Sequence, residues 1–291
     1  MRKTLAIFGL LALLASFGGA LHPLGDSLAV FRPVWAGLVV LAGLTLPGRL
    51  RWALVIAGLV GLGPILLSAF MPAPAPQGPV LTVYQKNILF KNPTPADLIA
   101  DIRASGADLV FLQESFGANR DLPDGLSDLY PHRLRCAARV YEGVLIMSRW
   151  PMSALNCAGN QGMASARVET PLGPVTAAAV HLHWPWPYGQ ADQMAVMRPV
   201  MAALPGPVII GGDFNSVAWS QTLAMAGQAT GTERVRPVQP TFDLAGVYPM
   251  AIDHVLVPQG WAAAAETRPK LGSDHRGLLV RIAPPGGVTQ P

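Results

Sequence analysis

The chain has 291 residues, of which 51% are hydrophobic and only 13% are charged, and its mean hydropathy is +0.36. A soluble domain carries roughly 25% charged residues, so this composition excludes an ordinary soluble protein and a wholly disordered one. Residues 1–78 hold five of the 21 basic side chains and one of the 17 acidic ones, which leaves 16 of each in residues 79–291. The net charge of +4 therefore lies in the first quarter and is weak evidence for nucleic-acid binding.

Three apolar runs fill the beginning of the chain, at residues 4–21, 28–46 and 52–70. The first and third contain no charged residue and are 18 and 19 residues long, close to the roughly 20 that cross a bilayer as a helix. Arg32 and Pro33 interrupt the second run near its start, so a short or re-entrant segment is the alternative there. We expect residues 1–70 to form a transmembrane region of two to three helices.

Basic residues beside these runs predict the orientation, because such residues stay on the cytoplasmic side of a membrane. Arg2 and Lys3 precede the first run, and Arg49 and Arg51 lie between the second and the third. Three spans would keep both clusters inside and carry the remainder of the chain outside. A cleavable signal peptide over residues 1–20 is the alternative for the first run. We expect a multi-pass protein of the inner or plasma membrane with a periplasmic or extracellular domain.

A proline-rich segment, residues 71–79, follows the third run. Its four prolines in nine residues cannot continue a helix and favour an extended spacer, so a domain boundary is expected here. Residues 80–283 are then enough for one sizeable hydrophobic core. Residues 284–291 are expected to form a disordered tail.

Short apolar, β-branched runs recur in this second part between glycines and prolines, and each has the length of a strand. They are residues 80–84, 109–112, 144–147, 175–180, 208–210, 252–257 and 277–282. Helices are expected at residues 95–105 and at about 190–204. Strands dominate and no glycine-rich dinucleotide fingerprint follows the first one. The fold class is therefore α/β, with an antiparallel or mixed two-sheet core and flanking helices rather than a parallel Rossmann sheet.

Polar residues gather at the ends of these apolar strands. They are Asn87, Glu114, His181, His183, Asp213, Asn215, Asp253, Asp274 and His275. Each by itself has an ordinary explanation as a turn, a cap or a hydrogen-bonded side chain. Their occurrence together needs a further explanation, because a buried charge is costly unless it is paired or bound to a metal. Carboxylate and amide oxygens suit Mg²⁺ or Mn²⁺, and imidazoles suit general-base work, so the set predicts metal-assisted phosphoester hydrolysis by water.

The second part also resembles the endonuclease/exonuclease/phosphatase superfamily, the DNase I-like proteins. The residues that carry this resemblance are Asn87, Gln113-Glu114, Ser148-Arg149, His181-Leu182, Gly212-Asp213-Phe214-Asn215, Asp253-His254 and Ser273-Asp274-His275. The resemblance covers residues 80–283. It implies a four-layer sandwich of two mixed β-sheets flanked by helices, here preceded by the transmembrane region. It also implies a divalent-metal-dependent phosphoester hydrolase of phosphodiesterase or nuclease type.

The resemblance implies a role for each catalytic residue. His275 would be the base or proton shuttle for the attacking water, and Asp253 would orient it. Asp213 and Asn215 would hold the nucleophile and the scissile phosphate. His181 would donate a hydrogen bond to a phosphate oxygen.

The same resemblance implies the metal ligands Asn87, Glu114 and Asp274, with Mg²⁺ or Mn²⁺ as the cofactor. His183 is the alternative phosphate-binding histidine, because the two histidines share a strand face. Glu142 lies where secreted DNases have a carboxylate that supports the first histidine, although an exposed glutamate explains it as well.

The substrate stays open between nucleic acid and a phospholipid headgroup. A neutral domain attracts a polyphosphate only modestly. In addition, Tyr141 is a doubtful match to the aromatic phosphate ligand of the DNA-cleaving members of this superfamily. The segment His-Trp-Pro-Trp-Pro-Tyr at residues 183–188 could stack a base, hold a lipid headgroup or pack as a rigid loop. The lipid bilayer is the expected partner, and no obligate protein partner is evident. The alternative from another class is a catalytically silent binding module on a membrane anchor, which the intact acids and histidines disfavour.

Cys136 and Cys157 are the two cysteines of the chain, and they flank the strand expected at residues 144–147. An external location permits a disulfide between them, and two free buried thiols are the alternative. Their spacing predicts no zinc site.

Overall fold

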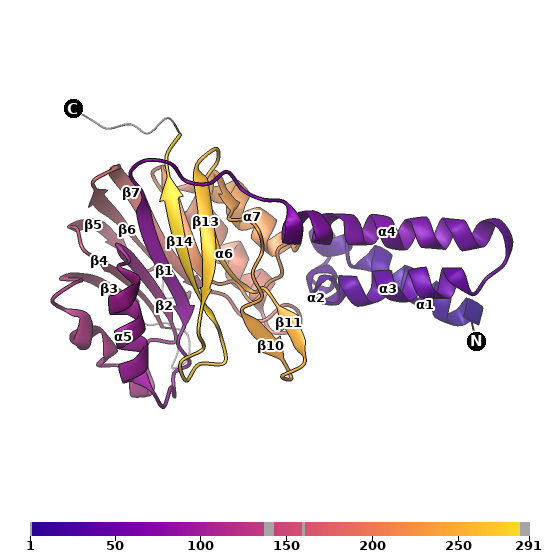
Figure 1. Cartoon of the computed structure of the whole chain (residues 1–291), viewed down its shortest axis with the longest axis horizontal. Coiled ribbons are helices and arrows are strands. Elements are labelled where there is room, and N and C mark those ends of the chain that lie inside the picture. The colour runs from indigo at the N-terminus through magenta and orange to yellow at the C-terminus, as the bar shows by residue number, and fades with distance from the viewer. Residues whose placement is uncertain (1, 137–142, 159–160, 286–291) are drawn as a thin grey trace.

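The buried, β-branched segments that follow residue 80 assemble into two six-stranded sheets that pack face to face (Figure 1). The computed structural model describes residues 2–136, 143–158 and 161–285. The two sheets and the helices on their outer faces are called the sandwich below. A group of N-terminal helices projects from one end of it.

The first sheet has the strand order β13-β14-β1-β2-β4-β3. Its strands are β1 (Leu81–Asn87), β2 (Leu109–Gln113), β3 (His132–Cys136), β4 (Val144–Ser148), β13 (Ala262–Arg268) and β14 (Gly277–Ala283). β1 and β2 pair in parallel, which requires a crossover connection, and α5 (Pro95–Ser105) provides it. The other neighbours in this sheet are antiparallel, so the sheet is mixed.

The second sheet has the order β5-β6-β7-β8-β12-β9. Its strands are β5 (Met152–Asn156), β6 (Met163–Thr170), β7 (Gly173–His181), β8 (Val208–Asp213), β9 (Thr232–Arg234) and β12 (Asp253–Pro258). β7 and β8 are parallel and are joined through α6 (Gln190–Ala202). Helix α7 (Gln221–Thr230) follows β8, and the two short strands β10 (Phe242–Leu244) and β11 (Tyr248–Met250) form a separate hairpin.

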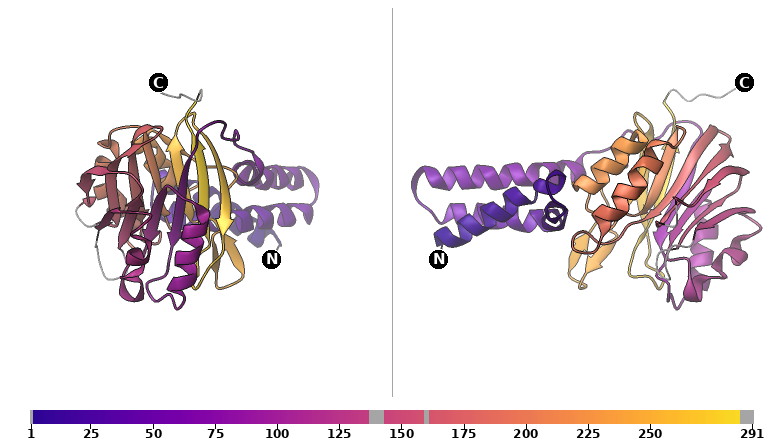
Figure 2. Two further views of the ribbon diagram at one scale, coloured as in Figure 1. Left: turned by 60° about the vertical axis from the view of Figure 1, so that its left-hand side comes forward. Right: turned by 180° about the vertical axis from the view of Figure 1, so that it is seen from behind.

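The main core lies between the sheets, where alternate residues of each strand point inward. Val83, Phe111, Ile146, Ala177 and Ile209 are fully buried there. The outer face of the second sheet packs against α6 and α7, and that of the first packs against α5. Helix, sheet, sheet and helix make four layers (Figure 2), so the predicted fold class is confirmed.

All seven strands predicted from apolar runs are present, and α5 spans the predicted residues. The strands β3, β5, β6, β9, β10, β11 and β13 and the helix α7 were not predicted. Several of these are exposed or edge strands with no apolar run. β13 begins with four alanines, which favour a helix by propensity, yet it pairs with β14 along its whole length. Pairing with a neighbour decided its structure.

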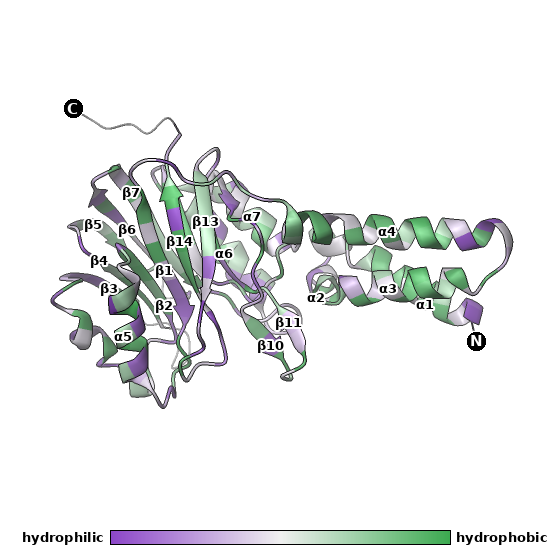
Figure 3. Ribbon diagram, in the orientation of Figure 1, coloured by the Kyte–Doolittle hydropathy of each residue, from purple (hydrophilic) through white to green (hydrophobic). Residues whose placement is uncertain are grey.

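The N-terminal helices α1 (Arg2–Ala15), α3 (Arg32–Leu44) and α4 (Gly48–Phe70) pack side by side and are called the helical bundle (Figures 1 and 2). A short 3-10 turn, η1 (Gly18–Ala20), and α2 (Leu24–Val30) lie at the end of the bundle next to the sandwich. The outward surface of the bundle is apolar (Figure 3), with Leu41 63% and Val60 66% exposed. An apolar surface of this extent needs a partner or a membrane to cover it.

Within the described residues, α4 is the one helix long and apolar enough to cross a membrane by itself. The pair formed by α2 and α3, bent by 69° at a break, would count as a second span if it acts as one. Helix α1 has 14 residues, or about 21 Å, which is less than the roughly 30 Å of a hydrocarbon core. The first two apolar runs therefore form shorter helices than predicted, because Gly18 and Gly19 follow α1 and Pro33 starts a new helix after the break.

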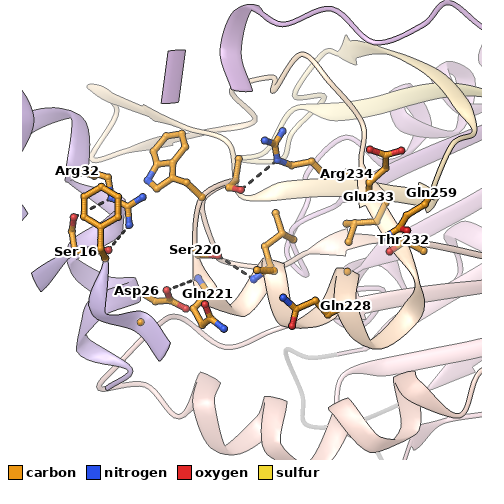
Figure 4. A pocket seen from close by; sticks show the side chains of 18 residues that line it. Ser16, Asp26, Arg32, Ser220, Gln221, Gln228, Thr232, Glu233, Arg234 and Gln259 are labelled. Carbon is orange, nitrogen blue, oxygen red and sulfur yellow. Dashed lines mark hydrogen bonds between the residues drawn. The ribbon is translucent and has the colours of Figure 1, made fainter. Parts of the chain in front are cut away.

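Helix α2 joins the helical region to the sandwich through polar contacts. The carboxylate of Asp26 accepts hydrogen bonds from the backbone N–H groups of Gln221 (2.7 Å) and Thr222 (2.8 Å) in the first turn of α7 (Figure 4). The indole N–H of Trp219 donates to the carbonyl of Ala29 at 2.7 Å. A carboxylate at this position satisfies free N–H groups and complements the helix dipole, so one part of the chain caps a helix of the other.

Arg32, which made the second apolar run uncertain, is buried at this junction (Figure 4). Its guanidinium donates to the hydroxyl of Ser16 at 3.0 Å and to the Ser16 carbonyl, and it lies 4.0 Å above the ring of Phe17. These contacts compensate the cost of burying its charge.

Cys136 and Cys157 form a disulfide, which resolves the alternative in favour of the bonded form. The bond connects β3, at the edge of the first sheet, to the segment that follows β5, at the edge of the second. Residues 71–80 adopt no regular secondary structure. Of the expected tail, residues 284 and 285 are described, and the rest lies outside the described residues.

Candidate active site

Two pairs of parallel strands, one in each sheet, bring polar residues to one end of the sandwich. β1 ends at Asn87 beside the end of β2, and β7 ends at His181 beside Asp213, the last residue of β8. β12 runs antiparallel to β8 in a register that pairs Asp253 with Asp213. The segment before β14 carries His275 to the same end, because β14 is antiparallel to β1.

These residues line a cavity of about 500 Å³, within the range of roughly 300–1,000 Å³ that is usual for small-molecule sites. The lining residues are Asn87, Glu114, His181, Leu182, His183, Trp184, Tyr188, Asp213, Asn215, Phe242, Asp274 and His275. Of the residues expected from the sequence to form the site, Asp253 is the one that does not line the cavity. It lies behind His275 instead.

His275 and Asp253 form a buried pair. The Nδ1 atom of His275 lies 2.7 Å from Oδ2 of Asp253, whose other oxygen accepts a hydrogen bond from Gln85 at 3.1 Å. Burial disfavours the charged form of each side chain, but the attraction between the two opposite charges outweighs this cost. The pKa of His275 is raised to about 10, and the pKa of Asp253 is lowered. His275 therefore holds a proton at neutral pH, and it becomes a base only after that proton has left.

The carboxylate of Asp213 is the common neighbour of Asn87, His181 and His275. Its Oδ2 atom accepts a hydrogen bond from Nδ2 of Asn87 at 3.1 Å, and lies 3.7 Å from Nε2 of His181 and 3.8 Å from Nε2 of His275. Its Oδ1 atom accepts from the backbone N–H of Asn215 at 2.8 Å. Burial raises the pKa of Asp213 to about 7, against the opposing influence of His275. A carboxyl group with such a pKa exchanges protons readily near neutral pH.

The two histidines after β7 both reach the cavity, but they differ in depth. His181 is buried, and its Nδ1 atom has no hydrogen-bond partner within the part of the chain that the structure describes. Burial, together with the charge of His275, lowers the pKa of His181 to about 4, so the ring is neutral at pH 7. His183 also lines the cavity and is half-buried. The structure thus places His181 next to Asp213, with 3.7 Å between Nε2 and Oδ2.

Glu114 and Asn215 sit in strained backbone positions, with φ of +59° and +45°. Side chains other than glycine occupy this left-handed region rarely, and such residues cluster at functional sites. Each follows the end of a strand, and each side chain lines the cavity. We read the strain as the result of turning the chain sharply while keeping these side chains directed into the site.

The oxygen atoms at the mouth of the cavity fit a hard divalent cation. Oε1 of Glu114 accepts from Nδ2 of Asn87 at 3.0 Å, and the same amide group also donates to Asp213. The amide thus lies between two carboxylates, a position that suits a positive charge. Asp274 adds an exposed carboxylate, and no cysteine lines the cavity. The carboxylate oxygens of Glu114 and Asp274 match the preferences of Mg²⁺ or Mn²⁺, whereas the amide oxygen of Asn87 accepts a hydrogen bond from the N–H of Leu89 at 3.0 Å.

A second group of potential ligands consists of Asp213, Asp253 and His275, whose ligand atoms all lie within 4.8 Å of one another. Asp253 and His275 already satisfy each other through their 2.7 Å contact, and Asp253 is not accessible from the cavity. A cation bound there would have to break this buried pair. We therefore favour the oxygen atoms around Glu114 as the place for a metal.

Sequence reasoning missed Lys86, which is fully buried on the other face of β1. Its Nζ atom donates to the carbonyls of Pro269 (2.9 Å) and His275 (2.7 Å), so it fixes the segment that carries the histidine. A lysine inside an apolar strand was the available signal. Burial lowers its pKa to about 8. Tyr141 and Glu142, which the sequence raised as weak candidates, lie outside the described residues.

With this geometry in hand, comparisons with known proteins identify the relatives of the chain. The sequence profile of the Endonuclease/Exonuclease/phosphatase family matches residues 85–275. No curated protein sequence matches the chain significantly.

Several solved structures share the fold. Sphingomyelinase C from Streptomyces griseocarneus has a TM-score of 0.51 and 18% identity, and the match covers 71% of this chain and 100% of that one. A variant of beta toxin from Staphylococcus aureus with bound magnesium ions has a TM-score of 0.53 and 17% identity, with 69% and 99% covered. TDP2 of D. rerio, complexed with single-strand DNA product, has a TM-score of 0.56 and 18% identity, with 70% and 99% covered. At these identities the similarity concerns the fold alone.

Proposed function

The chain belongs to the endonuclease/exonuclease/phosphatase family of phosphoester hydrolases, and from this premise we propose that it is a membrane-anchored phosphodiesterase that depends on a divalent metal. The proposal includes an external active site and water as the nucleophile. The observation that carries it is the convergence of Asn87, His181 and His275 on one oxygen of Asp213, at the cavity.

This convergence supplies what phosphodiester hydrolysis needs. A water molecule held by Asp213 and His275 attacks phosphorus, one ester P–O bond breaks, and the water loses its proton to this pair while the leaving oxygen gains one. Asp253 stabilises the charge on His275. The N–H groups of His181 and Asn87 lie where they donate to the phosphate oxygens as negative charge develops.

Asn87, Glu114 and Asp274 would hold the metal, with Glu114 as the main ligand. A bound Mg²⁺ or Mn²⁺ would supply Lewis acidity and orient the phosphate. Asn215 would keep the turn after β8 in place, because its side chain donates to the carbonyl of Leu182 at 2.7 Å while its N–H binds Asp213.

The helical bundle supports the membrane part of the proposal. Its outer surface is apolar (Figure 3), and the first residues of α1 and of α4 both lie at the end far from the sandwich (Figure 1). These segments contain Arg2, Lys3, Arg49 and Arg51. Basic residues stay in the cytoplasm, so the sandwich would face the periplasm or the exterior. The Cys136–Cys157 disulfide fits such an oxidising compartment.

The test uses the full chain in lipid nanodiscs and the hydrolysis of bis-p-nitrophenyl phosphate with Mg²⁺. We expect EDTA to abolish activity and added Mg²⁺ to restore it. We expect His275→Ala to lower kcat by roughly 10²–10⁴-fold, because a proton-transfer group contributes this much. His132→Ala, on the edge strand β3, is the matched control and should retain activity. Hydrolysis that is indifferent to both EDTA and His275→Ala would contradict the proposed function.

A further inference from the structure

A second, apolar cavity adjoins the active site. It has a volume of about 580 Å³, and Trp184 and Tyr188 line both this cavity and the catalytic one. Its other lining residues are Ser27, Val30, Phe31, Pro185, Trp186 and Leu244. We call this cavity the apolar groove. Trp184 and Tyr188 belong to both linings, so the two cavities are direct neighbours.

The groove is built where the helical region meets the sandwich. One wall comes from α2 and from Phe31, the residue between α2 and α3, and the other from the aromatic segment 183–188 and β10. Specific contacts hold the walls in place. The hydroxyl of Ser27 donates to the carbonyl of Trp186 at 2.6 Å, and the hydroxyl of Tyr248 donates to the carbonyl of Val30 at 2.9 Å. The ring of Phe31 lies 5.6 Å from that of Tyr248.

The position of the groove indicates what fills it. Its lining residues Ser27 and Val30 belong to α2, which lies at the end of the bundle next to the sandwich (Figure 1). Trp186 and Tyr188 are 47% and 69% exposed there, and such aromatic residues favour the level of the lipid headgroups. The lining carries no charged side chain. Such an apolar lining suits a hydrocarbon chain, which the bilayer of the proposed membrane-anchored state would supply.

We propose that the apolar groove binds the hydrocarbon tail of an amphiphilic phosphodiester drawn from the membrane, while its phosphate lies in the catalytic cavity. This inference rests on the proposed function and narrows its substrate to a lipid-like phosphodiester. A nucleic acid has no tail of this kind and would leave the groove without a ligand. In this arrangement the N-terminal helices are part of the substrate site as well as an anchor.

The test compares two probes with the same leaving group, methyl p-nitrophenyl phosphate and dodecyl p-nitrophenyl phosphate. The full chain in nanodiscs should hydrolyse the dodecyl probe with the lower KM and a similar kcat, because the tail adds binding energy that the reaction step does not use. Two variants alter the groove, since Trp186→Ala removes a wall and Ser27→Phe fills the space. Each should lower the ratio of kcat/KM for the dodecyl probe to that for the methyl probe by about tenfold.

Trp52→Ala is the matched control, because Trp52 is an exposed tryptophan near the far end of α4 and outside the groove. It should leave the ratio unchanged. The dodecyl probe partitions into the disc equally for all variants, so the change in the ratio reports the groove. The unfolding temperature of each variant shows that it is folded, and either groove variant is sufficient for the test.

The outcomes separate the two proposals. If both probes are hydrolysed and neither groove variant changes the ratio, the tail site is wrong and the proposed function stands. Faster hydrolysis of a single-stranded oligonucleotide than of the dodecyl probe would also overturn the proposed tail site. If neither probe nor bis-p-nitrophenyl phosphate is hydrolysed, the proposed function itself fails.

Discussion

Asp213 illustrates, at the scale of single residues, how this site is assembled. One oxygen of its carboxylate has neighbours from β1, from the end of β7 and from the segment before β14. Each neighbour was recognisable in the sequence as a polar residue at the end of an apolar strand. The roles of the supporting residues Gln85 and Lys86 were not recognisable, because these residues contact Asp253 and the carbonyl of His275, which are far away in the chain.

The pair formed by His275 and Asp253 yields the first prediction at this scale. Asp253→Asn keeps the shape of the side chain but removes the charge that stabilises protonated His275. We expect kcat to fall by roughly 10²–10⁴-fold with a small change in KM, as for an orienting carboxylate beside a catalytic histidine. Steady-state kinetics with bis-p-nitrophenyl phosphate measure this. Asp128→Asn, at an exposed carboxylate that pairs with Arg103, is the control, and an unchanged kcat in Asp253→Asn would refute the role.

At the scale of elements, α7 shows how the helical region and the sandwich depend on each other. Its N-cap, Ser220, accepts a hydrogen bond from the N–H of Leu223 at 3.1 Å, a contact between residues close together in the chain. Asp26 of α2 binds two further N–H groups of the same turn and the hydroxyl of Thr222. A helix of the sandwich therefore starts on a carboxylate that lies almost 200 residues earlier in the chain, 195 positions before Gln221.

The second prediction concerns this cap. Asp26→Ala removes three hydrogen bonds, and we expect it to lower the free energy of unfolding by about 1–2 kcal/mol. Urea unfolding of the full chain in detergent measures the loss. Amide hydrogen exchange should also become faster at Gln221 and Thr222. Asp192→Ala, at an exposed acid in the first turn of α6, is the control and should change stability less. Equal effects of the two substitutions would mean that Asp26 is not a structural cap.

At the scale of the whole molecule, the protein is a sandwich with its catalytic end beside the junction with the helical bundle. Among the described helices, α4 alone has the length for a span, whereas α1 is shorter and α2 and α3 form a bent pair. The chain nevertheless runs along the bundle three times (Figure 1), which brings both basic clusters to the far end. In the proposed membrane-anchored state, this arrangement would keep the active site and the apolar groove at the membrane surface.

The third prediction concerns the disulfide, which joins the edges of the two sheets. The cysteines are 21 positions apart, and a bond that closes a loop of this size contributes about 3 kcal/mol to stability. We expect reduction to lower the free energy of unfolding by this amount, as measured by urea unfolding with and without dithiothreitol. A double variant, Cys136→Ser with Cys157→Ser, should have the reduced stability and no longer respond to dithiothreitol. Identical curves for the oxidised and reduced wild type would contradict the prediction.

The sequence alone determined those features that depend on neighbours in the chain. Apolar β-branched runs indicated most core strands, and prolines and glycines marked their ends. The polar residues after those ends indicated the active site. The resemblance of residues such as Asp213 and His275 to a known family added their expected roles. The concentration of net charge in residues 1–78 distinguished the apolar N-terminal region from the neutral remainder of the chain.

Only the tertiary structure decided what depends on contacts between distant residues. It paired the alanines of β13 with β14, placed Asp26 under α7, and turned the aromatic segment 183–188 into a wall shared by the catalytic cavity and the apolar groove. No local pattern encodes these contacts. Their free energy comes from hydrogen bonds and burial between segments that meet only when the chain has folded.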